Sequence, residues 1–421
     1  NLYKITGNSM GLVYFGDKII KNVFINLQQD LTRNGLIERR QELDLRILLE
    51  LILFIRSLDK IKGQYFKVTW NKFYPPIYAD KFYPFEFFTY DFGLKNTKFV
   101  NIDGESRKVN LFESTPRVEL FYDVLDLHIK NEQLVSLREK LQPILNERNK
   151  PIDLSLLPAS FFPSKFSEIS VESVAYLDEF LDMFREHEEF TKRKNDENKA
   201  VKKFHEYCDY FNDAMSLSTK SFIFAIEFLV HGQQKLIDDT YINLKKDFMN
   251  SIRGYRQLAQ ISGYMGFWDL ADNNNLCFRI MFIVPDIGIE VDEWIEDIIY
   301  YWEDIYFNRI REKDVYKFKG TDAIRFEAVQ LPVAWSHKKL KPRFLEVGKN
   351  NLSMKKLICE HAISYIVLSE FYYCPFELQL YLKAIAVISE EQSKVESGLR
   401  INGKRMYRVF RGSLSKKQSL V

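Results

Sequence analysis

The sequence contains few of the residues that build metal centres or disulfide frameworks. Its 421 residues include four cysteines and six histidines. No two cysteines are spaced as CxxC, and no histidine pair forms HxH, HxxxH or HExxH, so there is no recognisable zinc motif. A chain of this length does not need disulfide bonds for stability. We therefore expect no metal cofactor, and a cytoplasmic protein whose thiols are reduced.

Long apolar runs and a surplus of charge of one sign are also lacking. The longest apolar run lies around Leu48–Ile55, well short of the roughly 20 residues that a membrane-spanning helix requires. The first residues carry no signal-peptide pattern, so no membrane partner is expected. Lys and Arg number 60 and Asp and Glu number 58, which gives a formal net charge of +2. Any electrostatic argument for nucleic-acid binding must therefore rest on local segments.

The sequence does contain enough apolar residues for two domains. It is 46% hydrophobic and 15% aromatic, and its length exceeds that of most single domains. Residues 188–203 read EEFTKRKNDENKAVKK, a charge run that is typical of a solvated linker or an exposed helix. We place the domain boundary there or just after it. This divides the chain into a mixed, mainly helical accessory region at 1–200 and a second domain at 218–421.

The first region shows helical spacing of apolar residues in three segments and one hairpin signal. The hairpin is predicted within 98–112, where Asp103-Gly104 supplies the turn. Two stretches, both containing proline, are expected to be irregular. The predicted helices lie at 42–58, 116–149 and 171–187, and the irregular stretches at 70–93 and 151–163.

The second domain has a more regular pattern. Strands are predicted at 221–230, 259–270, 276–285 and 321–331, with helices at 234–257 and 291–307 between them. The resulting order is β-α-β-β-α-β, which predicts an α+β, ferredoxin-like arrangement. Further helices are expected around 354–370 and 375–391. Strand aromatics such as Phe222, Phe224, Phe267 and Trp268 are interpreted as core residues, although exposed sheet aromatics can also stack on bases.

Residues that could bind a metal ion or a phosphate lie on and around the middle predicted strands of this domain. Cys277 and Arg279 are two positions apart and therefore share one face of their strand. Arg279 is interpreted either as an ion-paired structural residue or as a phosphate contact. Asp269 and Asp272 flank the preceding turn, and with Glu227 they would form a carboxylate metal site. This site is not favoured, because Glu227 is alone on its strand and aspartate is common in turns.

Two basic segments provide the local electrostatic signal. The stretch 338–343 reads KKLKPR, and residues 400–421 contain seven basic residues and no acidic residue. Basic residues interleaved with aromatic ones suit phosphate contact combined with base stacking, although a solubilising tail and an exposed loop have the same composition. The candidate nucleic-acid contacts are Arg279, Lys338, Lys339, Lys341, Arg343, Arg400, Lys404, Arg405, Arg408 and Arg411.

The order of these elements carries a resemblance to a known family. Tyr264–Asp269 reads YMGFWD and is followed, after a turn, by Cys277-Phe278-Arg279. A later segment reads Tyr381-Leu-Lys383, and the chain ends near Arg408–Ser413, which reads RVFRGS. In this order the second domain resembles the replication-initiator-like proteins of filamentous, inovirus-type phages and related prophages, which carry a rolling-circle (HUH) endonuclease domain.

The resemblance implies a set of roles for these positions. Cys277 and Arg279 occupy the place of the family's two metal-binding histidines, with Asp269 nearby, and Tyr381 occupies the place of the tyrosine that attacks DNA. The lysine lies two residues after Tyr381, where the family has it at three. A cationic Arg279 would repel the Mg²⁺ or Mn²⁺ that nicking requires. The resemblance therefore implies a degenerate scaffold that binds DNA or RNA, preferably single-stranded, without nicking it.

Two alternatives remain open from the sequence. The first is an active single-strand endonuclease, in which Tyr381 is the nucleophile and Asp269 supports an unconventional Mg²⁺ or Mn²⁺ site. The second is a protein-interaction subunit of a larger mobile-element or phage-defence assembly. The high aromatic content favours this second alternative, because Tyr, Trp and Phe are enriched at protein interfaces.

Overall fold

The computed structural model divides into two compact units. The sheet unit contains Asn1–Leu36, Ala200–Glu370 and Glu377–Val421, and the helical unit contains Ile37–Lys199 and Phe371–Phe376. The first 36 residues thus belong with the second half of the chain, whereas the sequence analysis placed them in the accessory region. The structure describes residues 15–34, 39–59, 67–69, 72–74, 97–102, 105–110, 112–128, 171–231, 240–271, 276–313, 324–375, 378–379, 400–401, 404–405 and 409–412.

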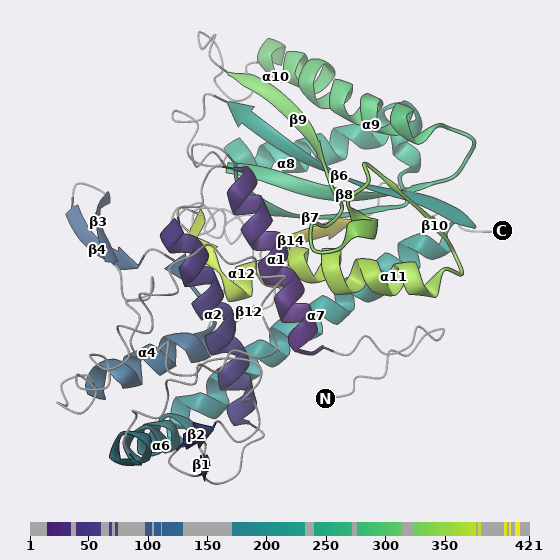
Figure 1. Ribbon diagram of the computed structural model, residues 1–421. Coiled ribbons are helices and arrows are strands. Elements are labelled where there is room, and N and C mark those ends of the chain that lie inside the picture. Colours follow the sequence, from purple (N-terminus) through teal and green to yellow (C-terminus); the bar gives the residue numbers. More distant parts are fainter. Residues whose placement is uncertain are drawn as a thin grey trace. The chain divides into compact units, whose positions relative to one another are not determined.

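A six-stranded antiparallel sheet forms the centre of the sheet unit (Figure 1). Its longest strand, β6 (Lys220–His231), pairs along one edge with β8 (Leu276–Pro285). Along its other edge, the first half of β6 pairs with β10 (Leu345–Gly348) and the second half with β9 (Arg325–Leu331). Beyond β8 follow β7 (Gly263–Leu270) and then β14 (Val409–Gly412). The chain is therefore a mixed α+β protein, as predicted.

The four predicted strands of the second domain are present as β6, β7, β8 and β9. All ten residues between the ends of β6 are buried, because helices cover both faces of the sheet. The short strands β10 and β14 were not predicted. Each adds one edge strand to the four predicted ones.

Aromatic side chains fill the space between one face of the sheet and three helical segments. These segments are α8 (Thr240–Ser251), α9 (Val291–Tyr300) and the π-helical η7 (Tyr301–Tyr306), which continues into α10 (Phe307–Lys313). The ring of Phe228 lies 5.1 Å from that of Phe278 and 5.3 Å from that of Trp302. Phe222, Phe224, Phe267 and Trp268 are buried as well, which confirms their assignment to the core.

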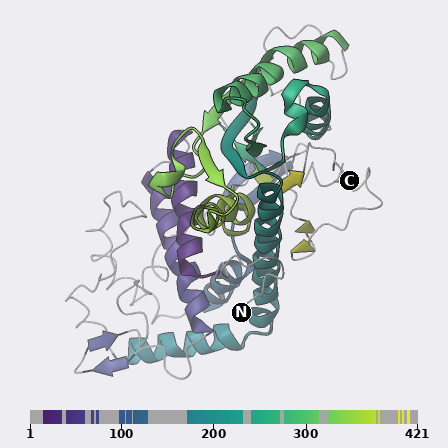
Figure 2. The same cartoon turned by 90° about the vertical axis from the view of Figure 1, so that its right-hand side faces the viewer.

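The opposite face is covered by helices from distant parts of the chain (Figures 1 and 2). They include α1 (Asp17–Arg33), for which the sequence analysis made no prediction. The others form one continuous stretch of α11 (Leu352–Ile358), the π-helical η9 (Cys359–Ile363) and α12 (Ser364–Tyr372). Tyr365 of α12 contacts Phe267 of β7 with a ring separation of 5.4 Å.

The charge run at 188–203 is the first half of a 29-residue helix, α7 (Glu188–Ser216), drawn as one uninterrupted helix in Figure 2. Of the two predicted possibilities, the structure therefore selects the helix over the linker. Ion pairs three residues apart join Glu189 to Lys192 and Asp196 to Lys199, each at 2.8 Å. Such pairs stabilise a helix with few apolar residues.

The helical unit confirms the predicted hairpin and parts of the three predicted helices. Phe121 of α4 packs edge-on against Phe180 and Phe184 of α6, with ring separations of 5.4 and 5.3 Å. The elements are α2 (Arg39–Leu58), α4 (Pro116–His128), α6 (Val171–Glu186), β1 (Lys67–Thr69) with β2 (Lys72–Tyr74), β3 (Thr97–Ile102) with β4 (Glu105–Asn110), and β5 (Phe112–Glu113) with β11 (Cys374–Pro375).

Several predicted segments fall outside the described residues. They are the rest of the helix beyond residue 128, the loop at 151–163, most of 70–93 and nearly all of the helix at 375–391. Within the described ranges, no helix has both the length and the apolar character needed to cross a membrane.

Gly266 of β7 lies where the sheet leaves no room for a side chain. A Cβ there would lie 2.1 Å from the backbone oxygen of Arg279 and 2.8 Å from Cζ of Phe410 in β14. We expect Gly266→Ala to lower the free energy of unfolding by about 1–3 kcal/mol or more, the usual cost of overpacking. Urea unfolding followed by circular dichroism measures the change. Gly348→Ala is the matched control, because its Cβ would have no neighbour within 4 Å; an equal loss of stability in both variants would contradict this prediction.

Candidate functional site

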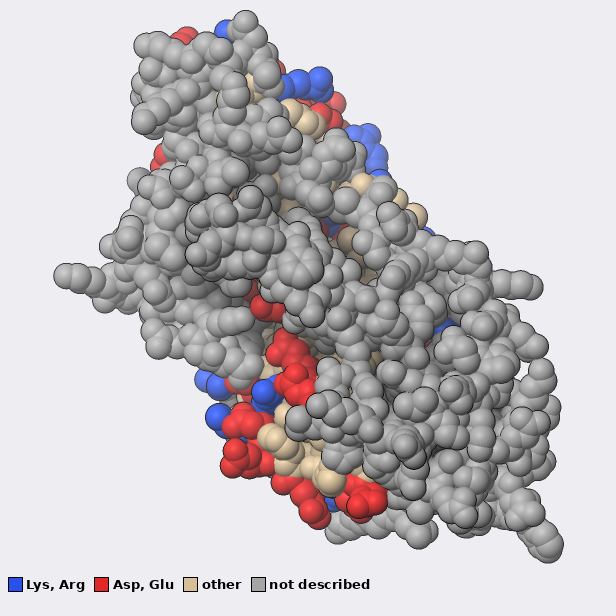
Figure 3. Space-filling model, turned by 90° about the vertical axis from the view of Figure 1, so that its left-hand side faces the viewer, with Lys and Arg blue, Asp and Glu red and all other residues tan. Residues whose placement is uncertain are grey.

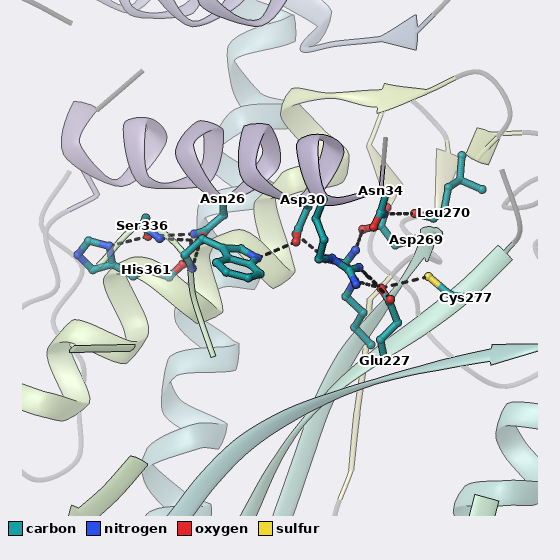
Figure 4. A network of polar contacts seen from close by, with 12 residues as sticks. Asn26, Asp30, Asn34, Glu227, Asp269, Leu270, Cys277, Ser336 and His361 are labelled. Atoms are coloured by element: carbon teal, nitrogen blue, oxygen red, sulfur yellow. Dashed lines mark hydrogen bonds and ion pairs between the residues drawn. The ribbon is translucent and has the colours of Figure 1, made fainter. Parts of the chain in front are cut away.

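The face of the sheet beneath α1 brings together most of the residues singled out on the middle strands. In the strand register, Glu227 of β6 lies beside Arg279 of β8, and Cys277 of β8 lies beside Asp269 of β7. Because side chains alternate along a strand, Cys277 and Arg279 project to the same face, as predicted. Figure 4 shows that this face meets α1 in a chain of polar contacts.

Arg279 lies at the centre of this chain of contacts and is 5% exposed. Its Nε donates to Oε2 of Glu227 at 2.5 Å, Nη1 pairs with Asp30 of α1, and Nη2 lies 3.4 Å from Oδ2 of Asp269. Burial alone would lower the pKa of Arg279, but the three carboxylates raise it well above its ordinary value. The guanidinium therefore remains charged at every accessible pH.

A second arginine completes the arrangement around Glu227. Nη2 of Arg33, at the end of α1, contacts both carboxylate oxygens of Glu227 at 2.8 Å. Burial acts to raise the pKa of Glu227, but the charges of Arg279 and Arg33 and their hydrogen bonds lower it overall. Glu227 is thus an anion with two cationic partners, and it has no protonated form near neutral pH to act as a general acid.

Cys277 lies in the same place but has little nucleophilic character. Its Sγ is 3.7 Å from Oε2 of Glu227, with the thiol as donor. Burial raises the pKa of Cys277 well above its ordinary value, and the negative charge of Glu227 raises it further. Only the thiolate is a good nucleophile or metal ligand, so this environment keeps the group inert.

The structure shows what surrounds these candidate residues. Asp269 and Glu227 do converge, as the carboxylate-site alternative requires, but they converge on the guanidinium of Arg279. That group is enclosed by protein carboxylates, so a contact between Arg279 and a nucleic-acid backbone would require these ion pairs to open. Within the described residues there is no group of three or more His, Cys, Asp and Glu side chains that could hold a metal ion. Asp272 and Tyr381 lie outside the described residues.

The polar contacts continue along α1 to the segment that follows β9 (Figure 4). The Oδ1 atom of Asn26 accepts hydrogen bonds from the backbone N–H groups of Trp335 at 2.7 Å and Ser336 at 3.0 Å. The indole N–H of Trp335 donates to Asp30 at 2.8 Å, so one helix holds both the sheet and this segment.

Ser336 and His361 are hydrogen-bonded but are not arranged as a nucleophile and its base. Nδ1 of His361 lies 2.8 Å from Oγ of Ser336, and Nε2 lies 3.4 Å from the amide nitrogen of Asn22. Because that amide can only donate, Nε2 is the acceptor and the ring proton is on Nδ1, pointing to Ser336. Burial, with the charges of His337 and Lys18, lowers the pKa of His361 to about 4. The ring is therefore neutral, and it donates to Ser336 instead of accepting its proton.

The first basic segment lies on the surface directly after these contacts. Lys338, Lys339, Lys341 and Arg343 are all exposed, and the first two belong to a short 3-10 helix, η8 (Lys338–Leu340). Burial and the positive charges of Lys339, Lys18 and Lys338 lower the pKa of His337, which marks a locally positive environment. The structure thus brings four of the predicted contact residues together on one loop between β9 and β10.

The second basic segment is described only in part. Arg411 is exposed in β14, where its guanidinium carbon lies 4.7 Å from the ring centroid of Tyr207 and 5.4 Å from that of Tyr210. Its Nη1 also donates to the backbone oxygen of Glu206. Arg400 belongs to β12 (Arg400–Ile401) and Lys404 and Arg405 to β13 (Lys404–Arg405), whereas Arg408 lies outside the described residues.

Acidic side chains near the basic loop are paired with lysines outside it. Figure 3 shows acidic and basic side chains next to each other in the lower left of the face that it presents. Near the basic loop, Glu360 pairs with Lys18 at 3.2 Å and Lys356 at 3.7 Å, and Glu346 pairs with Lys220 at 2.9 Å. The loop lysines themselves have no ion pair among the described residues.

Sequence reasoning missed the contribution of α1. Asn22, Asn26, Asp30 and Arg33 recur at intervals of three or four residues, which places them on one face of a helix. This polar stripe is visible in the sequence, but its direction toward the interior is not, because polar faces of helices usually face solvent.

Comparison with known proteins adds no family. No family model, no curated protein and no solved structure matches this chain.

We expect Arg279→Met to lower the free energy of unfolding at pH 7 by about 3–5 kcal/mol, because buried carboxylates lose their central cation. The lowered pKa of Glu227 stabilises the fold above the unfolded pKa of the group, and this contribution is lost as pH falls through the folded pKa. In the variant that pKa rises, so the deficit relative to wild type should shrink between pH 7 and pH 4.5. Urea unfolding at both pH values measures it. Arg325→Met removes an arginine that is 74% exposed and is the control; a deficit that stays constant or grows at pH 4.5 would contradict the assignment.

Proposed function

We propose that this protein binds nucleic acid, single-stranded in preference, through the basic loop at 338–343, and that it is built on a rolling-circle-initiator scaffold without metal-dependent nicking. The main support for nucleic-acid binding is that four basic side chains are exposed within six residues that include no acidic residue. Such a segment replaces the counterions of a phosphate backbone, which is the main source of affinity for nucleic acids.

The topology of the sheet supports the scaffold. The strands follow in chain order β6, β7, β8, β9, with α8 between the first two and α9 between the last two. In space their order is β9-β6-β8-β7, and all neighbours are antiparallel. We infer a ferredoxin-like β-α-β-β-α-β core to which β10 and β14 add edge strands. This core alone implies no activity, so the function must be argued from its side chains.

The contacts of Arg279 support the loss of nicking. A nicking tyrosine needs a divalent cation that polarises the scissile phosphate. At the strand positions where the resembled family has two histidines, this chain has an inert thiol and a guanidinium with three carboxylate partners. The carboxylates around it are already paired with guanidinium groups, so they are not available as ligands for a divalent cation. We therefore assign the site a structural role and the surface loop the contact with nucleic acid.

The loop is held firmly enough to present its charges in one arrangement. Gln330 of β9 and Arg343 form two hydrogen bonds of 2.7 Å, one between side chains and one to the backbone oxygen of Arg343. At the start of the loop, Asn26 fixes Trp335 and Ser336 through their backbone N–H groups. An ordered loop loses less conformational entropy on binding than a flexible one, so more of the electrostatic gain appears as affinity.

Replacing Lys338, Lys339 and Lys341 by Gln should weaken binding to a labelled single-stranded oligonucleotide and flatten its salt dependence. Each phosphate that is no longer neutralised by a lysine reduces the slope of log K against log salt by about 0.7. Mobility-shift titrations at 50 and 200 mM salt measure both quantities, with single-stranded DNA, duplex DNA and RNA compared.

The matched control replaces three exposed basic residues elsewhere in the sheet unit, Lys202, Lys246 and Arg309, by Gln. It removes the same charge and should keep the wild-type slope. An equal weakening in both variants would mean that only net charge matters, and binding that does not respond to salt would reject the proposal. Cleaved or protein-linked strands on a denaturing gel with Mg²⁺ or Mn²⁺ would instead support the endonuclease alternative. No shift at all would favour a protein-interaction subunit.

A further inference from the structure

His337 lies directly before the basic loop at 338–343 and is partly exposed, and the sequence analysis did not include it among the nucleic-acid contacts. Its Nδ1 accepts a hydrogen bond from the backbone N–H of Lys339 at 3.2 Å, so the side chain caps the start of η8. With Nδ1 as the acceptor, the ring proton is on Nε2. This N–H group has no hydrogen-bond acceptor among the described residues, and it can therefore donate to a ligand that lies on the loop.

Positive charge surrounds the ring of His337 from two separate parts of the chain. Lys338 and Lys339 follow it in η8, and Lys18 belongs to the first turn of α1. Burial and the charges of Lys339, Lys18 and Lys338 lower the pKa of His337. The ring is therefore neutral at pH 7 in the free protein, and the lysines oppose its protonation.

Two further titratable groups near His337 belong to η9. The ring of His361 lies 5.0 Å from that of His337, and burial, with the charges of His337 and Lys18, lowers the pKa of His361 to about 4. His361 is therefore neutral near neutral pH. The carboxylate of Glu360 is paired with Lys18 at 3.2 Å. Among the described residues no carboxylate pairs with His337, so its positive surroundings are left for an anion to balance.

A phosphate bound beside His337 changes the charge of the ring. Its negative charge offsets the lysine charges, and a nearby opposite charge favours the protonated form of histidine. Protonation places a hydrogen on Nδ1 and ends the hydrogen bond from Lys339. In return, the imidazolium forms a charge-assisted hydrogen bond with the phosphate, which is roughly twice as strong as one between neutral groups. The pKa of His337 is therefore higher in the complex than in the free protein.

We propose that His337 is a further phosphate contact of the nucleic-acid site and that it takes up a proton from solution when nucleic acid binds. This inference rests on the nucleic-acid binding proposed for the basic loop. Because the complex binds more protons than the free protein, linkage requires that affinity rises as pH falls through the pKa of His337 in the complex. At higher pH the loop binds with its lysines and Arg343 alone.

Fluorescence anisotropy of the full chain with labelled oligo(dT) between pH 8.0 and 5.5 at constant salt tests the proposal, because thymine does not titrate in this range. The affinity of the wild type should rise about tenfold, which corresponds to a pKa about one unit higher in the complex. His337→Asn should lose most of this rise, because asparagine still caps η8 but carries no titrating group. Calorimetry in two buffers of different ionisation enthalpy should show proton uptake by the wild type that His337→Asn lacks.

His231→Asn is the matched control, because it removes a histidine of the same unit that pairs with Glu327 at 2.7 Å and lies outside the loop. It should keep the wild-type pH dependence. Salt-sensitive binding with the same pH dependence in wild type and His337→Asn would overturn this inference and leave the proposed function standing, and so would an equal loss in both variants.

A wild type that binds no oligo(dT) at any pH would instead reject the proposed single-strand binding, and this inference with it. His337→Lys covers the case in which His337→Asn does not fold. This variant carries a permanent charge, so its affinity at pH 8.0 should match that of the wild type at pH 5.5 and should vary little with pH. A pH dependence equal to that of the wild type would overturn the inference.

Discussion

A guanidinium group buried within a folded protein needs an ionic partner, because removing an unpaired charge from water costs several kcal/mol per ion. Arg279 lies on a central strand and satisfies this requirement with Asp30, Glu227 and Asp269. Two of these partners come from neighbouring strands, and the third comes from a helix 249 residues earlier in the chain. The strands alone therefore do not supply all the ionic partners of Arg279, and α1 is needed to provide the third.

The same requirement explains the composition of α1. Its buried face carries Asn22, Asn26, Gln28 and Asp30, residues that are rarely buried without partners. Each of the asparagines finds acceptors or donors on the π-helical η9 or on the segment after β9. An apolar face would dock in many registers, whereas this one satisfies its hydrogen bonds in a single position. The polar residues thus fix the position of α1, whose buried apolar residues Ile20, Val23 and Phe24 pack in the same interior.

Features that depend on residues near each other in the sequence were predicted, whereas contacts between distant parts of the chain were missed. Short runs of apolar and aromatic residues identified β6 to β9, the alternation of side chains placed Cys277 and Arg279 on one face, and helical spacing identified α2 and α6. The pairing of Arg279 with Asp30 has no local signature, so Arg279 was left between a structural and a phosphate-binding interpretation. The four-residue edge strands β10 and β14 are too short for their own pattern to be recognised. The exposed loop at 338–343 was one of the two interpretations of KKLKPR, because a run of basic residues is a local signal of exposure.

Helix α1 both covers one face of the sheet and fixes the start of the basic loop. Asn26 and Asp30 lie one turn apart on α1, and while Asp30 pairs with Arg279, Asn26 holds the backbone of Trp335 and Ser336, where the loop begins. Trp335 joins the two by donating to Asp30. A change that weakens the pairing of Arg279 must therefore also loosen the start of the loop. This coupling gives the buried charges a consequence for the surface, because the helix that pairs with Arg279 also positions the start of the basic loop.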